Sequence, residues 1–184
     1  MGVQVVPERF SLVQYDSAVI ADLAASLLEQ LGMGDRSLRI EVDETSLLGR
    51  LTVAHGDPIV ITVESGALED LRVGRVLSEV TTGLTLGRAL LRARDRLDGT
   101  FGEAPADEEL TNAQVAAWEA YCLGRLERAG LVPHQQRCRY NFRNRHGFTD
   151  AADTAFDGLW SADRITWAEL EQRSQQAIAA KLFV

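Results

Sequence analysis

The stretch "IVITVE", from Ile59 to Glu64, carries the strongest structural signal in this sequence of 184 residues. It is rich in β-branched residues and apolar on both faces, as expected of a strand covered on both sides or nearly so. The residues just before it, His55–Pro58, have the composition of a turn. We therefore predict a central strand that a turn separates from the preceding segment.

Two shorter strands are predicted upstream of that turn, because Leu38–Val42 alternates in polarity and Leu51–Ala54 has a similar composition. Further upstream, the apolar spacing from Ile20 to Leu31 predicts an amphipathic helix. Downstream of the central strand, the period becomes helical from about Leu71 to Leu97, with apolar residues on two sides. A helix of this kind is expected to be buried between layers.

Strands that come early and helices that follow them predict an α+β fold. We expect a small, mainly antiparallel sheet packed on the long buried helix, and a mostly helical C-terminal half. Capping boxes at Thr111–Gln114 and Thr166–Glu169 predict the starts of two later helices. The whole chain, residues 1–184, is interpreted as a single domain. It has a helix–sheet–helix core at residues 1–98 and a helical extension at residues 107–184 that contains one arginine-rich strand.

The composition is that of a soluble globular protein, with 46% hydrophobic residues, 25% charged residues and a net charge of -8. Met1–Ser11 does not resemble a signal peptide, and no apolar stretch reaches the roughly 18 residues of a membrane span. We therefore expect a cytoplasmic protein that does not bind membranes. The negative charge argues against nucleic-acid binding, and Cys122 and Cys138 fit no metal or redox spacing.

The arginine-rich segment "QQRCRYNFRNRHGF", Gln135–Phe148, is the main candidate site. If it is extended, period two places its arginines on one face and the rings of Tyr140 and Phe142 on the other, toward the core. Either the arginines pair with the protein's own carboxylates, which is the favoured interpretation, or they bind a phosphate or carboxylate ligand. The candidate anion-binding residues are Arg137, Arg139, Arg143, Arg145 and His146.

The order of a helix, short strands, the segment Pro58–Glu64 taken as an edge strand, and a long helix resembles the core of the zincin metallopeptidases. In that family the long helix carries HExxH, whose histidines bind zinc and whose glutamate activates water. The corresponding segment here is "VLSEVTTGLTLGRALL", Val76–Leu91. The resemblance implies a scaffold with a groove that could still bind a peptide.

The zinc-binding motif itself is missing from this segment. In the register set by Gly87, the motif is replaced by Leu84–Arg88, and in the register of Ser78–Thr82 only Glu79 is retained. Neither register contains a histidine, so the resemblance implies a degenerate, metal-free relative. We assign no metal ligand and no cofactor. A metal site built from His134, His146, Asp150 and Asp153 is the weakest alternative.

No recognisable catalytic motif is present: the chain has three histidines and lacks a GxSxG elbow, a Walker loop and a GxGxxG sequence. We assign no catalytic residue and favour a noncatalytic protein over an enzyme. The predicted function is that of a protein- or peptide-binding domain, for which a homodimer is one form. The alternative is a small-molecule anion-binding protein or enzyme that uses the arginine-rich segment.

Overall fold

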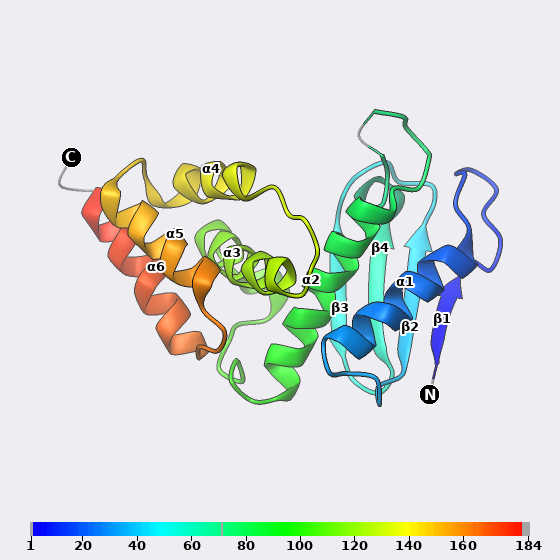
Figure 1. Cartoon of the computed structure of the whole chain (residues 1–184), viewed down its shortest axis with the longest axis horizontal. Coiled ribbons are helices and arrows are strands. Elements are labelled where there is room, and N and C mark those ends of the chain that lie inside the picture. Colours follow the sequence, from blue (N-terminus) through cyan, green and yellow to red (C-terminus); the bar gives the residue numbers. More distant parts are fainter. Residues whose placement is uncertain (1, 71, 182–184) are drawn as a thin grey trace. The chain divides into compact units, whose positions relative to one another are not determined.

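The computed structural model describes residues 2–70 and 72–181. The chain forms two compact units, Met1–Arg94 and Asp95–Val184. In the described residues, four strands form one sheet and six α-helices accompany it, most of them in the C-terminal half (Figure 1). The predicted α+β class and the helical C-terminal half are therefore confirmed. No helix in the described ranges is both long enough and apolar enough to cross a bilayer.

The first unit contains the sheet and the helices that cover it. Its elements are β1 (Val3–Val6), α1 (Ser17–Gln30), β2 (Leu38–Asp43), β3 (Leu51–His55), β4 (Ile59–Glu64), the short 3-10 helix η1 (Ser65–Ala67) and α2 (Glu79–Leu97), whose last three residues belong to the second unit. The strand order is β1-β2-β4-β3.

The prediction of a mainly antiparallel sheet is wrong. β1 pairs with β2 and β2 pairs with β4 in parallel, and only β3 and β4 are antiparallel. The physical reason lies in the connections. α1 carries the chain back across the sheet, so that β2 starts at the same end as β1 and runs parallel to it. β3 then runs in the opposite direction, so that β4 is again parallel to β2. β1 was not predicted, because "VQVV" is short.

β4 lies between β2 and β3, so its inner position is confirmed and its placement as an edge strand in the zincin comparison is wrong. Ile59, Ile61 and Val63 are buried, whereas Val60 and Thr62 point to the opposite face and are more exposed. Figure 1 shows α1 and α2 on the same face of the sheet. The strand is therefore covered mainly on one face, not on both.

α1 buries one stripe, whereas α2 is buried on more than one side, with Leu86, Leu90 and Leu91 all at 0% exposure. Asp16 caps α1 by accepting a hydrogen bond from the backbone N–H of Ala18 at 2.9 Å. The long helix ends at Leu97 as predicted, but it begins at Glu79. The preceding residues form a loop instead, in which the Asp70 N–H donates to the Val76 carbonyl at 2.9 Å. Leu71, where the helix was expected to start, lies outside the described residues.

The second unit is a bundle of helices around an aromatic core. Its elements are η2 (Asp107–Glu109), α3 (Asn112–Arg128), α4 (Gln135–His146), α5 (Asp150–Ser161) and α6 (Trp167–Lys181). Both predicted capping boxes are present at the starts of α3 and α6. The rings of Phe101, Trp118, Tyr121 and Trp167 contact one another in the core.

The prediction of an arginine-rich strand is wrong, because Gln135–His146 forms the helix α4. Arginine and glutamine favour helices, and this segment contains none of the β-branched residues that favour strands. A helix places Arg139 and Arg143 one turn apart on one side, and this spacing matches acidic residues one turn apart on α5.

Candidate functional site

Two of the four candidate arginines are held by carboxylates of α5. Arg143 donates through Nε to Asp153 Oδ1 at 2.7 Å, and its Nη2 contacts the second carboxylate oxygen. Arg139 donates through Nη1 to Asp157 Oδ2 at 3.2 Å. The Arg139 guanidinium also lies over the Phe156 ring, 4.6 Å from its centroid. These contacts join α4 to α5, as expected if the arginines pair within the protein.

The electrostatics agree with that pairing. The hydrogen bond from Arg143 holds the pKa of Asp153 below its ordinary value, and the same bond raises the pKa of Arg143. The hydrogen bond to Asp157 raises the pKa of Arg139. All three groups therefore stay charged near neutral pH, and an anionic ligand would have to displace a carboxylate to reach either guanidinium.

The outer face of α4 is different. Arg137 and Arg145 are exposed and make no ion pair with any residue in 2–70 or 72–181. Beside them, the rings of Tyr140 and Phe148 are 58% and 63% exposed and contact each other edge to face. The expectation that Tyr140 faces the core is wrong, since it assumed a strand. The anion-binding role stays a prediction, and it now depends on the two exposed arginines.

His146, the fifth candidate residue, lies in the core of the second unit. Its Nδ1 is 3.0 Å from the Phe142 carbonyl oxygen, and its Nε2 is 2.8 Å from Ser174 Oγ on α6. Because a carbonyl can only accept, Nδ1 must carry the proton and Nε2 must accept a hydrogen bond from Ser174. The pair has the reach of a serine–histidine dyad, but both residues are 0% exposed, so no substrate can approach them.

We expect the stability of the protein to fall with pH below about 6.5 because of His146. Burial lowers the pKa of His146 from the ordinary 6.5, against the opposing effects of the Phe142 carbonyl and of Glu171. The unfolded chain therefore binds a proton at a higher pH than the folded chain. The stabilisation from the neutral ring is present above pH 6.5 and is lost as the pH falls toward the lower folded pKa.

Urea denaturation between pH 5 and pH 8 measures this effect, with about 1.4 kcal/mol expected per unit of pKa difference. His146→Gln should remove the slope near pH 6, whereas His134→Gln, at an exposed position, should leave it in place. An unchanged slope in His146→Gln would assign the pH dependence to another group.

A metal site at these residues has no geometric support. His146 already uses both ring nitrogens within the core, and His134 is exposed at the start of α4. Within 2–70 and 72–181, no three histidine, cysteine, aspartate or glutamate side chains come close enough to share a metal ion. A pocket of about 410 Å³ does lie between α5 and α6, but Arg173 is the one arginine in its lining.

The free edge of β3 offers a different kind of site in the first unit. The Glu64 N–H donates to the Arg50 carbonyl at 3.0 Å. Because bonding alternates along antiparallel strands, Thr52 and Ala54 bond to β4 opposite their register partners Thr62 and Val60. The residues between them must direct their N–H and C=O groups away from β4, toward the outer edge: Leu51, Val53 and His55.

No described backbone group pairs with that outer edge. The strand "LTVAH" contains no charged residue and no proline, which are the usual means of preventing edge strands from pairing with other chains. The edge is therefore a row of unused backbone donors and acceptors, suited to pairing with another extended strand.

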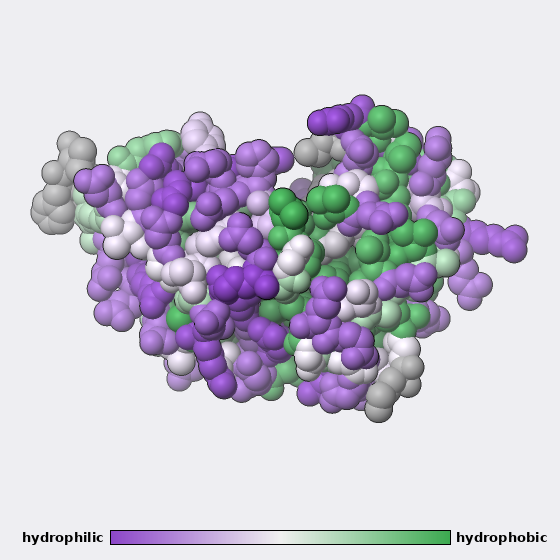
Figure 2. Space-filling model, viewed as in Figure 1, coloured by the Kyte–Doolittle hydropathy of each residue, from purple (hydrophilic) through white to green (hydrophobic). Residues whose placement is uncertain are grey.

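Exposed aliphatic side chains lie on the loops at the end of the sheet where β3 starts. The carboxyl ends of β1, β2 and β4 share one end of the sheet, because these strands are parallel. The loops that follow them are joined by hydrogen bonds from Gln14 to Arg75 and from Ser65 to Ser46. Figure 2 shows apolar side chains over the first unit. Five are exposed on or next to these loops: Leu12, Leu47, Leu48, Val73 and Val80.

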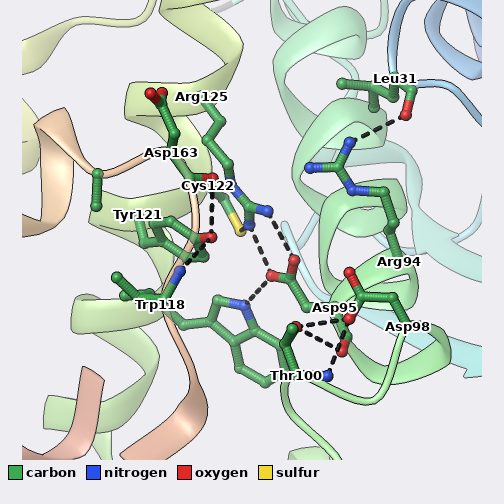
Figure 3. Close-up of polar contacts among 12 residues, drawn as sticks. Leu31, Arg94, Asp95, Asp98, Thr100, Trp118, Tyr121, Cys122, Arg125 and Asp163 are labelled. Atoms are coloured by element: carbon green, nitrogen blue, oxygen red, sulfur yellow. Dashed lines mark hydrogen bonds and ion pairs between the residues drawn. The ribbon is translucent and has the colours of Figure 1, made fainter. Parts of the chain in front are cut away.

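The second unit contains a buried ion pair that was not predicted from the sequence (Figure 3). Both nitrogens Nη1 and Nη2 of Arg125 donate to the Asp95 carboxylate at 2.6 Å, and Trp118 Nε1 donates to the same carboxylate at 2.9 Å. Arg125 also stacks on the Tyr121 ring, 3.7 Å from its centroid. Asp95 is 2% exposed and Arg125 is 8% exposed, so this arrangement holds the core and is closed to ligands.

The electrostatics of the pair show how it tolerates burial. Burial is the largest single effect and by itself would lower the pKa of Arg125, but the hydrogen bonds to Asp95 and the charges of Asp95, Cys122 and Tyr121 together raise the pKa instead. A signal for this site exists in the sequence: Trp118, Cys122 and Arg125 follow a helical spacing, so an arginine lies on the same side of the helix as apolar residues. An arginine there requires a buried acidic partner.

No known protein family, curated protein or solved structure shows significant similarity to this chain.

Proposed function

We propose that this chain is a noncatalytic cytoplasmic protein that binds a protein or peptide partner by strand addition to the outer edge of β3. The observation that carries the proposal is the outward direction of the backbone groups of Leu51, Val53 and His55, which lack partners among the described residues. A strand added there would gain backbone hydrogen bonds of the kind that hold the sheet together.

The neighbouring apolar loops support the same surface. Leu47 and Leu48 are 56% and 54% exposed, and they precede β3 by only a few residues. Backbone pairing alone gives little specificity, which in strand addition comes from pockets and surfaces for alternate side chains. The exposed leucines would supply an apolar contact for a partner strand that extends beyond Leu51.

A metal-free scaffold similar to the zincins remains part of this proposal. It rests on the element order alone, a strand followed by a long helix; β4 is an inner strand and does not match the edge strand of the comparison. No histidine lies on α2. A protein of this kind could retain peptide binding without hydrolysis.

Val53→Pro is expected to abolish partner binding and to leave the fold intact. Proline removes the outward N–H of Val53, and proline is tolerated at edge positions whose N–H faces solvent. Ala54→Pro provides the contrast, because it removes a hydrogen bond to β4. We expect Ala54→Pro to lower the free energy of unfolding by about 1–3 kcal/mol more than Val53→Pro, as measured by urea denaturation.

A random library of twelve-residue peptides, selected on the purified protein, supplies the binding probe. The enriched peptides should alternate apolar and polar residues and should bind Val53→Pro at least about tenfold more weakly than the native protein. Thr62→Lys, on the inner strand β4, should leave binding unchanged. Peptides that bind Val53→Pro as tightly as the native protein would refute the proposal.

The outer face of α4 supports a second candidate function. Arg137 and Arg145 have free guanidinium groups in the described structure, and the exposed rings of Tyr140 and Phe148 lie beside them. A small phosphate or carboxylate ligand is the class that such arginines would bind. Titration with inorganic phosphate, compared between the native protein and Arg137→Ala/Arg145→Ala, separates this function from strand addition.

A further inference from the structure

We infer that the strand that adds to β3 is β3 of a second copy of this chain, so that the protein forms a two-fold symmetric dimer. The inference rests on the proposed function and names its partner. In the dimer, two four-stranded sheets would join across their β3 edges into one continuous sheet.

The direction and register of the pairing follow from the outward groups. Two copies of one strand related by a two-fold axis pair antiparallel. Residues whose backbone N–H and C=O groups point outward must face each other in order to form hydrogen bonds. The register that pairs every residue of β3 is centred on Val53. Val53 then faces Val53 of the second copy, and Leu51 faces His55 of the second copy. Each of these pairs exchanges two backbone hydrogen bonds, as in any antiparallel ladder.

The side chains fit this register as well. Between the hydrogen-bonded pairs, Thr52 faces Ala54 of the second copy, and both residues are exposed on the face of the sheet away from α1 and α2. Small side chains at both positions allow the close approach of a non-hydrogen-bonded pair, at about 4.5 Å between Cα atoms. No two residues of like charge oppose each other along the strand.

Charge complementarity at the ends supports the same partner. Arg50 and Asp57 flank β3 at its two ends, and both are exposed. In the register centred on Val53, Arg50 faces Gly56 of the second copy, and Asp57 follows Gly56 in the bend after β3, so one end of the joined strands carries Arg50 of one copy and Asp57 of the other. The two-fold axis repeats this pairing at the other end. Each end of the joined strands thus brings together opposite charges, which favours a second copy over an unrelated strand.

The other edge of the sheet is less suited to pairing. β1 has four residues, and Pro7, which has no N–H, follows it directly. Short strands and prolines are the usual protection of a sheet edge. β3 is one residue longer and no proline follows it directly, so the β3 edge is the less protected of the two.

Cysteine cross-linking tests the register directly. Thr52→Cys and Ala54→Cys are prepared as separate full-length proteins, each also carrying Cys138→Ser, because Cys138 is partly exposed. When the two are mixed under a mild oxidant, we expect a disulfide-linked dimer at a yield at least about tenfold above that of either protein alone, because only facing positions are within disulfide reach. Equal yields in the mixture and in either protein alone would overturn the register.

A second pair of variants keeps the test valid if oxidation is inefficient. In the double variant Thr52→Lys/Ala54→Lys, two lysines face each other at each of the pairs formed by positions 52 and 54. Their repulsion should convert the dimer to a monomer, as measured by sedimentation equilibrium. Thr62→Lys carries the same substitution on the inner strand and should stay dimeric. A native protein that is monomeric at all concentrations would overturn the inference.

The two proposals fail in different ways. The native protein could be monomeric while selected peptides bind it and do not bind Val53→Pro. In that case the partner is not a second copy of the chain, but strand addition to β3 still holds. If the dimer forms but neither the lysine pair nor Val53→Pro affects it, both the partner and the β3 edge are wrong.

Discussion

Asp95→Ala is expected to lower the free energy of unfolding by about 3–5 kcal/mol, the usual cost of removing one partner of a buried ion pair. The substitution leaves the Arg125 guanidinium at 8% exposure without its carboxylate and also removes the acceptor of Trp118 Nε1. Urea denaturation followed by tryptophan fluorescence measures the loss, since Trp118 belongs to the same cluster.

Two comparisons identify the cause. Asp95→Ala/Arg125→Met removes both charges and should recover most of the lost stability, because an apolar pair of similar volume often replaces a buried ion pair at little cost. Glu41→Ala breaks the more exposed Arg39–Glu41 pair, with side chains 36% and 41% exposed, and should change stability by about 1 kcal/mol or less. An equally small effect of Asp95→Ala would show that the pair is hydrated.

Gly124→Ala is expected to destabilise the second unit by about 3 kcal/mol, at the upper end of the usual cost of overpacking. Gly124 lies on α3, where a Cβ atom would overlap the carbonyl oxygen of Trp160 on α5 and would lie 2.7 Å from its carbonyl carbon. Backbone atoms cannot move aside as a flexible side chain can. The two helices would have to separate, and the stacking of Phe156 on Trp160 would be disturbed.

Gly158→Ala is the matched control on α5, because the same substitution there should have the opposite sign. A Cβ at Gly158 would meet only the end of the Arg173 side chain, at 3.4 Å. Alanine should therefore stabilise the helix by up to about 1 kcal/mol through its higher helix propensity. Thermal denaturation of both variants compares them directly. A stabilising Gly124→Ala would mean that α3 and α5 are not in close contact.

The sheet and its first helices could be predicted in outline from local patterns. "IVITVE" is β-branched and forms an inner strand, and the apolar spacing from Ile20 to Leu31 forms α1. Strand direction could not be predicted in the same way. Whether β2 runs parallel or antiparallel to its neighbours depends on how the connections cross the sheet, and side-chain alternation is the same in both cases.

The arginine-rich segment shows a different limit. Its arginines at Arg137, Arg139, Arg143 and Arg145 share one parity, which resembles a strand, while Arg139 and Arg143 also share the spacing of one helical turn. The deciding signal was the absence of Val, Ile and Thr from Gln135–His146. Pairing of the arginines with the protein's own carboxylates was the favoured interpretation. The particular partners on α5 could be assigned only when both segments were known to be helices.

The free edge of β3 could not be found from sequence, because edge and inner strands differ in their neighbours rather than in their own composition. Leu51–Ala54 was predicted as a strand, and nothing in its residues shows which side remains unpaired. The lack of charged residues in "LTVAH" gains meaning only when the strand is known to lie at the edge.

Amide hydrogen exchange along β3, measured by NMR, tests the central claim most directly. In a dilute sample of Thr52→Lys/Ala54→Lys, which should not self-associate, we expect fast exchange at Leu51, Val53 and His55 and slow exchange at the two substituted positions, 52 and 54. In the native protein at high concentration, the outer three amides should become protected. Protection of all five amides in the dilute variant would show that the edge is already covered, and would contradict this account.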